Sequence, residues 1–238
     1  MYGDGVARTA AVSSGENGRV DTPPRWLRPA ILAGAAGPVI AWVLTVVVIV
    51  GWPGYDPIRQ SISLLANAPW GGIQTLAFAA SGLLGIAWAF GLAAVLGTST
   101  RERAVVRALL LVQAAIGLAF AILPTDPEGT PTSTVGGLHL LDFYLYAVTM
   151  PLTLLVLGFV MRRDPRWAGA VRPTFVAAAL AVVSIALVPA TLDGPLTPWL
   201  GLLERLFVAI PSVWQVGAAL VALRIAGADG AGSVEAPA

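Results

Sequence analysis

Cysteine and lysine are both missing from this chain of 238 residues, and charged residues of either sign are few. Without cysteine the chain has no disulfide, no thiolate nucleophile and no cysteine metal site. Only 11% of its residues are charged, against roughly 25% in an ordinary soluble domain. Hydrophobic residues make up 57% of the chain, and the mean hydropathy is +0.79. This composition is that of a membrane protein with several spanning segments.

Six apolar segments divide the chain, at about 31–52, 73–97, 104–123, 139–161, 173–192 and 200–223. About 20 residues of helix are enough to cross the roughly 30 Å hydrocarbon core, and backbone groups in lipid must bond within their own segment. We therefore predict an all-α, polytopic membrane protein, with one bundle of six transmembrane helices over residues 25–224. The polar, glycine-rich ends, 1–24 and 225–238, are predicted to be disordered cytoplasmic tails.

The distribution of arginine predicts the orientation of this bundle. All fourteen basic residues are arginines, and all except Arg59 and Arg205 fall in the N-terminal tail, in the second and fourth connections or at the end of the last segment. By the positive-inside rule, both termini are expected in the cytoplasm. The first, third and fifth connections would then form an extracytoplasmic face, and the protein would lie in the inner (cytoplasmic) membrane of the cell.

The third connection contains the only histidine of the chain, several acids and no arginine. If the fourth helix starts near Val135, His139 lies in its first turn and Asp142 follows three residues later on the same face. A neighbouring carboxylate would favour the charged imidazolium and orient its ring, as in many proton relays and ligand sites. Alternatively, His139 is an interfacial residue hydrogen-bonded to Asp142 or to a carbonyl. Asp126 is a further candidate in the same connection.

The first connection holds one of the two arginines on this side. Arg59 belongs to the stretch YDPIRQSISLLANAPWGG, which mixes apolar residues with Gln60, Ser61 and Ser63. This pattern suits a short helix that starts near Pro57 and lies in the interface or in the mouth of the bundle.

The other arginine, Arg205, follows Glu204 about one and a half turns into the last apolar segment. Adjacent helical residues point about 100° apart, so the two side chains should meet different partners. We predict that Arg59 and Arg205 are partly buried and pair with carboxylates of the same side. The alternative is that they extend to lipid headgroups.

Deeper in the membrane, Gln113 and Gln215 are expected to form contacts between helices. Small residues four apart, Ser81 with Gly85 and Ala87 with Gly91, predict a close-packing seam on the second helix.

Several stretches of the sequence together resemble a known family. They are YDPIRQSISLLANAPWGGIQTLAFAASGLL, ILPTDP, GGLHLLD and LLERL, and the likeness covers about residues 30–224. The chain resembles the bacterial membrane-protein family catalogued as domain of unknown function 998. This resemblance implies a six-helix integral membrane protein, with a distant similarity to the eukaryotic Frag1/DRAM/Sfk1 membrane proteins. It implies no particular activity.

Three functions remain open. The first is binding of a lipid or small amphiphile, such as an isoprenoid-like molecule, at a polar site on the extracytoplasmic face. The second is a membrane-embedded enzyme that acts on a lipid or isoprenoid by acid–base chemistry there, and the third is a small transporter. No P-loop, G-x-S-x-G or H-E-x-x-H motif is present. The candidate catalytic residues are His139, Asp142, Glu204 and Asp126, and the candidate binding residues are Arg59, Gln60, Ser61, Ser63 and Arg205.

We expect no cofactor and no nucleic-acid partner. A metal held by His139 with nearby acids is possible by ligand type, although acids in a loop are usually only solvated. A protein partner or a homo-oligomer is left open by the sequence.

Overall fold

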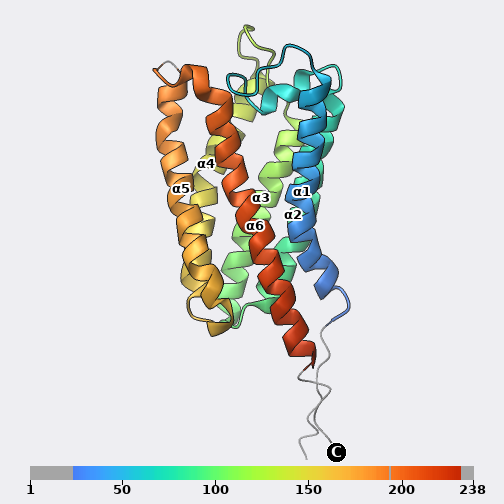
Figure 1. Cartoon of the computed structure of the whole chain (residues 1–238), viewed down its shortest axis with the longest axis vertical. Coiled ribbons are helices and arrows are strands. Elements are labelled where there is room, and N and C mark those ends of the chain that lie inside the picture. Colours follow the sequence, from blue (N-terminus) through green and yellow to red (C-terminus); the bar gives the residue numbers. More distant parts are fainter. Residues whose placement is uncertain (1–23, 193, 232–238) are drawn as a thin grey trace, which may run out of the picture.

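The computed structural model describes residues 24–192 and 194–231 as a bundle of six long helices (Figure 1). The long helices are α1 (Leu27–Gly51), α2 (Gly71–Val95), α3 (Thr100–Ile122), α4 (Thr134–Met161), α5 (Ala168–Leu192) and α6 (Leu200–Ala231). Short 3-10 helices lie in three connections, at η1 (Ser63–Asn67), η2 (Pro165–Trp167) and η3 (Thr197–Trp199). Six helices are long and apolar enough to cross a membrane. The predicted six-helix transmembrane bundle is therefore confirmed, and its orientation stays a prediction.

All the long helices except α6 begin before the apolar segments that predicted them, and serine side chains cap two of these starts, at α3 and α4. Ser99 precedes α3, where its hydroxyl accepts a hydrogen bond from the Glu102 backbone and the Glu102 carboxylate accepts one from the Ser99 backbone. Ser133 precedes α4, where its hydroxyl accepts a hydrogen bond of 3.0 Å from the backbone of Gly136. Such caps satisfy amide groups that the first helical turn leaves unpaired.

The last helix ends later than predicted. It continues to Ala231, beyond the expected end near residue 223, because Ile225 and Ala226 are still buried in the core. The predicted C-terminal tail therefore starts inside a helix. Residues 1–23 and 232–238 of the two predicted tails lie outside the described residues.

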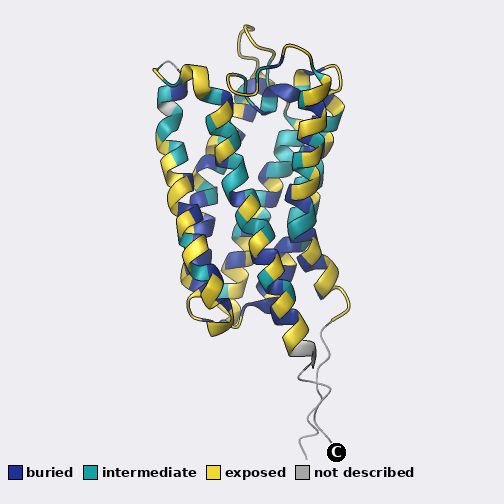
Figure 2. Cartoon of the chain, in the orientation of Figure 1, coloured by how far each residue is buried: buried dark blue, intermediate teal, exposed yellow. Residues whose placement is uncertain are grey.

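The six helices form a closed ring. Each long helix packs against its neighbours along the chain, and α1 packs against α6 to complete the circuit. Figure 1 shows α6 crossing the front of the bundle obliquely, between α5 and α1. The outer surface is apolar, with Val50 79%, Val148 67% and Val213 73% exposed. Exposed residues lie along the outward faces of the helices in Figure 2, and the many apolar ones among them are expected for helices in contact with lipid.

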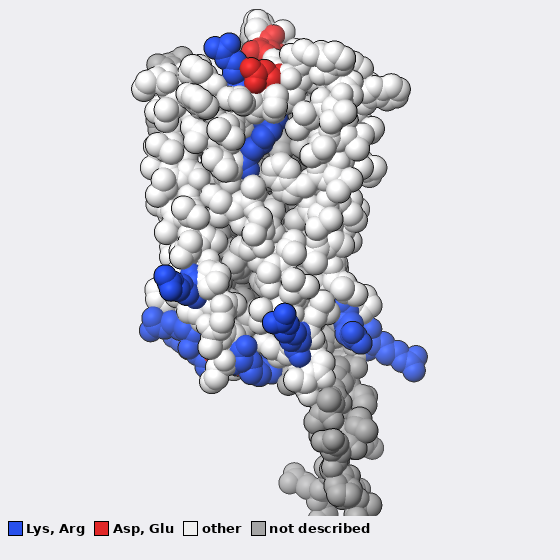
Figure 3. All heavy atoms as spheres, viewed as in Figure 1, with Lys and Arg blue, Asp and Glu red and all other residues white. Residues whose placement is uncertain are grey.

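Charged residues gather at the two ends of the bundle (Figure 3). We call the end formed by connections 96–99 and 162–167 the arginine end, and the end formed by connections 52–70, 123–133 and 193–199 the loop end. The main hydrophobic core lies toward the arginine end, where Trp88, Leu92, Leu157, Met161 and Trp167 are almost completely buried. This core contains residues of all six long helices. The two cavities of the bundle described below lie toward the loop end.

The first connection folds differently from the prediction. Its helical segment is η1, which begins at Ser63 rather than near Pro57, and Pro57 lies in a turn. The predicted position was wrong because the buried apolar residues are the later ones: Ile62, Leu64 and Leu65 are buried in the bundle, whereas Ile58 beside Pro57 is 46% exposed. The connection therefore lies in the mouth of the bundle, which is the second of the two predicted placements.

Candidate functional site

Two adjoining cavities lie at the loop end. The first, the inner cavity, has a volume of about 170 Å³ and lies inside the ring between α1, α2, α3, α4 and α6. The second, the lateral groove, has a volume of about 320 Å³ and lies between α4, α5, α6 and the first and third connections. Four residues line both spaces: Ser63, His139, Phe143 and Glu204. Two predicted catalytic candidates, on α4 and α6, thus stand at the boundary between the two cavities.

His139 is buried, with 6% of its surface exposed. Its Nδ1 lies 2.6 Å from the carbonyl oxygen of Leu123, which follows the last turn of α3. Because a carbonyl can only accept, Nδ1 carries the hydrogen, and Nε2 of the neutral ring is left as an acceptor. The ring centre also lies 5.1 Å from that of Phe120. Of the two sequence interpretations, the hydrogen bond to a carbonyl is therefore the one observed.

Asp142 was predicted to pair with His139, and the structure shows no hydrogen bond between them. Asp142 is 7% exposed, and its Oδ2 has no hydrogen-bond partner among the described residues. It lines neither cavity. The pairing fails because the imidazole hydrogen is already donated to the carbonyl of Leu123 at the end of α3, where helix carbonyls lack intrahelical partners.

Glu204 connects α6 to the first connection. Its Oε2 accepts a hydrogen bond of 2.7 Å from the backbone amide of Ile62. A charge-assisted bond of this kind is stronger than a neutral one and holds the start of η1 against the cavities. The carboxylate therefore has a positioning role, and its residue also lines both spaces.

The predicted ion pairs of the two loop-end arginines are not found among the described residues. Arg205 is partly buried, as predicted, but it donates to the carbonyl oxygens of Pro57 at 2.7 Å, Gln60 at 2.9 Å and Gly201 at 2.9 Å. It also donates to the Tyr55 hydroxyl and lies over the Tyr55 ring. The fork of a guanidinium suits several acceptors at once, and the turns of the first connection supply carbonyls that no helix satisfies. Arg205 therefore binds backbone carbonyls instead of the predicted carboxylates.

Arg59 departs further from the prediction, because it is exposed and lies within ion-pair distance of no carboxylate in the described part of the chain. Asp193, one acid of that side, lies outside the described residues. Gln60 joins two connections. Its Nε2 donates a hydrogen bond of 2.6 Å to the carboxylate of Glu128, and its Oε1 accepts one of 2.9 Å from the backbone amide of Asp56. Neither Arg59 nor Gln60 lines a cavity.

Asp126 and Ser61 lie on the wall of the lateral groove. Asp126 accepts hydrogen bonds from the Ser133 backbone at 2.8 Å and from its hydroxyl at 2.6 Å, and these bonds lower the pKa of Asp126. It therefore extends the cap of α4. Ser61 likewise accepts from the Leu64 backbone at 3.2 Å and stabilises the start of η1. Within residues 24–192 and 194–231, no cluster of three His, Asp or Glu side chains could hold a metal.

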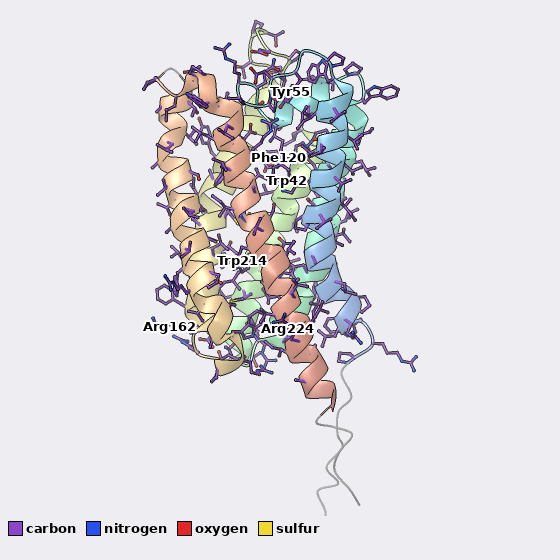
Figure 4. The ribbon with its side chains drawn as sticks, in the orientation of Figure 1. Trp42, Tyr55, Phe120, Arg162, Trp214 and Arg224 are labelled. Atoms are coloured by element: carbon purple, nitrogen blue, oxygen red, sulfur yellow. The ribbon has the colours of Figure 1, made fainter. Side chains whose placement is uncertain are left out.

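Several residues of the inner cavity were not candidates from the sequence. Gln74 is 1% exposed, and its Oε1 has no hydrogen-bond partner in the described part of the chain. Five aromatic residues also line this cavity: Trp42, Phe78, Phe120, Phe143 and Tyr146. In Figure 4, Trp42 and Phe120 lie at similar heights, on the arginine-end side of Tyr55. The available signal for Gln74 was a polar amide within an apolar segment. Gln74 lies at the predicted start of the second helix, where polar residues are common.

A closed ring of six apolar helices, with cavities of mixed polar and apolar lining toward one end, defines an integral membrane protein of the helical-bundle class. The chain belongs to the family described as "Protein of unknown function (DUF998)", whose family model matches residues 35–221. No curated protein and no solved structure shows significant similarity to the chain. The family resemblance seen in the sequence is thus confirmed, and the distant similarity to Frag1/DRAM/Sfk1 proteins stays a prediction.

Proposed function

We propose that this protein binds a membrane lipid or another amphiphile at the loop end of the bundle. The observation that carries this proposal is the composition of the lateral groove. One part of its wall is apolar and comes from three helices: Leu140, Val188, Leu200, Leu203 and Phe207. The adjoining part is polar: Ser61, Ser63, Asp126, His139 and Glu204. A molecule with an apolar chain and a polar head matches this division.

The position of the groove also supports an amphiphile. It lies between helices that span the membrane, so a ligand can enter sideways from the lipid without passing through water. An apolar chain exchanges lipid contacts for contacts with α4, α5 and α6, while its head meets Glu204 and His139 at the boundary with the inner cavity. Burying these polar groups without partners is costly in an apolar medium, and a polar head would offset that cost.

Photolabelling tests this proposal. A long-chain alcohol with a diazirine on its alkyl chain is reconstituted with the full chain and irradiated, and labelled peptides are identified by mass spectrometry. We expect labels on α5 and α6 near Ser184 and Leu203, which line the groove. Replacing Ser184 with Trp fills the groove and should reduce this labelling by about tenfold, the effect of roughly 1.4 kcal/mol in binding.

The matched control is Val183→Trp. Val183 is the neighbour of Ser184 on α5 but is 56% exposed on the outside of the bundle. It should leave the groove labels unchanged, because its side chain points to the surrounding lipid. Labels spread evenly over the outward faces of the six helices, and equally abundant in Ser184→Trp, would contradict binding in the groove.

A further inference from the structure

Several side chains that line the inner cavity carry hydrogen-bond acceptors without a partner, beginning with Gln113. The Nε2 of Gln113 donates to the hydroxyls of Thr149 at 2.9 Å and Thr153 at 3.3 Å. Each of these hydroxyls already donates to a carbonyl of its own helix, so it can only accept from the glutamine. This arrangement fixes the orientation of the amide, and its Oε1 has no partner in the described part of the chain.

Gln215 on α6 is oriented in the same way. Its Nε2 donates at 3.0 Å to the carbonyl of Gly34, which Pro38 leaves free one turn later because proline has no amide hydrogen. The Oε1 of Gln215 is therefore the end of the amide available to the cavity that the residue lines. The Nε2 of His139 adds a further acceptor from α4, and Gln74 of α2, whose Oε1 has no partner in the described part of the chain, also lines this cavity.

Aromatic rings form much of the remaining wall. Phe120 is the centre of this group, since its ring lies 5.7 Å from Phe78, 5.1 Å from His139 and 6.3 Å from Tyr146, measured between ring centres. The indole nitrogen of Trp42 donates at 3.1 Å to Ser212, which holds that ring across α1 and α6. The faces of aromatic rings attract cations, most strongly where water is excluded.

The charge of the lining has one sign. Glu204 is the only carboxylate among the lining residues, and no arginine lines the inner cavity. Arg205, its neighbour in sequence, is directed to the carbonyls of the first connection instead. A ligand with a negative charge would therefore find no arginine among these lining residues, whereas a cation would find Glu204.

We propose that the inner cavity binds an ammonium group, with Glu204 as its counter-ion, the glutamine oxygens as hydrogen-bond acceptors and the aromatic rings as a surrounding cage. This inference rests on the proposed function and specifies the head of the amphiphile. The same chemistry can come from two sources, the amine head of a membrane lipid or a free organic amine.

Competition against the diazirine probe tests the inference with the full chain in a maltoside detergent. The competitors share a twelve-carbon chain and differ in the head, which is a primary ammonium, a sulfate or an uncharged diol. We expect the primary ammonium compound to compete about tenfold better than the other two, the effect of one charge-assisted contact. Benzylammonium, which has no long chain, distinguishes the sources. If this short amine competes as well as the twelve-carbon ammonium compound, the ligand is a free amine. If it competes weakly, the ligand is the head of a lipid.

Two substitutions locate the preference. Glu204→Gln keeps an oxygen for the amide of Ile62 but removes the charge, and it should abolish the tenfold preference for the cation while leaving the diol unaffected. If this variant does not fold, Phe120→Leu removes a ring face with little change in apolar volume and should reduce the preference several-fold. Phe159→Leu is its control, because Phe159 contacts Phe175 and Arg162 outside the inner cavity.

The outcomes separate the two proposals. Equal competition by all three heads, with labels still in the groove, would overturn the ammonium site, keep the amphiphile proposal and leave water as the partner of the unpaired oxygens. Absence of groove labels with every probe would overturn the amphiphile proposal itself. A cation preference that survives Glu204→Gln and Phe120→Leu would also overturn the site described here.

Discussion

Asp164 organises the arginine end through a single carboxylate. It accepts hydrogen bonds from the Gly97 backbone at 2.8 Å and the Arg166 backbone at 3.1 Å, and it pairs with the Arg166 guanidinium at 2.9 Å. Arg166 also donates to the carbonyl of Val95 at 3.1 Å. The carboxylate therefore ties the connection between α4 and α5 to the end of α2. Its side chain is only 4% exposed, so these bonds are little screened by water.

Asp164→Asn should destabilise the protein, because the substitution removes the charge that the guanidinium and two amides surround. We expect a loss of about 2 kcal/mol, the usual contribution of hydrogen bonds to a charged group. For a chain of this size that loss lowers the midpoint of thermal unfolding by roughly 4–8 °C, measurable by circular dichroism in detergent. Arg59→Gln, which removes one charge from an exposed side chain that pairs with no carboxylate in the described part of the chain, is the control and should change the midpoint little.

The same residue predicts a dependence on pH. The Arg166 side chain, followed by the Gly97 and Arg166 amides, lowers the pKa of Asp164 below its ordinary value. A lowered folded-state pKa gives stability that is complete above the unfolded value of about 3.9 and is lost as the pH falls through the folded value. Wild type should therefore lose this contribution below about pH 4, and Asp164→Asn should not show that part of the loss. An identical acid response in both proteins would contradict this account.

Individual residues also show what the sequence can predict about the site. His139 and Glu204 were candidates from the sequence because ionisable groups are rare in such an apolar chain, and Ser63 was one because of the polar pattern of the first connection. All three line both cavities. The partners of Arg205 could not be predicted, because backbone carbonyls are the same in every sequence and only the fold of a connection leaves them free. The role of Gln74 depended equally on packing, since only the ring of helices encloses its amide.

Helix α2 packs closely against both of its neighbours through glycine. A side-chain carbon at Gly91 would lie 2.8 Å from backbone atoms of Ala30 and Ile31 in α1. On the other side, Gly85 approaches Ala114 of α3, where the same added carbon would lie 3.3 Å from its Cβ. The sequence predicted one seam of small residues on this helix. The structure divides these residues between two faces, because α2 lies between α1 and α3 in the ring.

Gly91→Ala should therefore destabilise the bundle. The added methyl group meets backbone rather than a flexible side chain, so α1 and α2 must separate, at a cost of about 1–3 kcal/mol. The matched change is Gly217→Ala in α6, where an added carbon has open space and alanine favours the helix. We expect a lower unfolding midpoint for the first variant and an equal or higher midpoint for the second. Equal stability of the two variants would show that the α1–α2 contact tolerates expansion.

The helices themselves were predictable, whereas their arrangement was not. Hydropathy and length identify all six because lipid requires each spanning segment to bond internally. The ring depends on contacts that no periodic pattern reports, such as the bond from Gln215 to the Gly34 carbonyl that joins α6 to α1. The sequence correctly predicted that Gln113 and Gln215 join helices, but it did not predict that both residues would line a common cavity.

At the scale of the whole molecule, the two ends of the bundle differ in packing as well as in charge. The arginine end holds the main hydrophobic core and the ion pairs of Arg163 with Glu102 and of Arg166 with Asp164. The loop end holds both cavities, and its connections are joined by hydrogen bonds to carbonyls. A solid end and a hollow end suit a protein that keeps its ring closed while a ligand enters at one side.

The orientation of these two ends in the membrane can be tested directly, because the chain contains no cysteine. Cysteine is introduced singly at Thr132, exposed at the loop end, or at Thr100, exposed at the arginine end. A thiol reagent that cannot cross the membrane is then applied to intact cells. The excess of arginine at the other end predicts that the loop end faces outward, so Thr132→Cys should be labelled and Thr100→Cys should react only after the cells are opened. The reverse pattern would place the cavities on the cytoplasmic side, and the amphiphile would then enter from the inner leaflet.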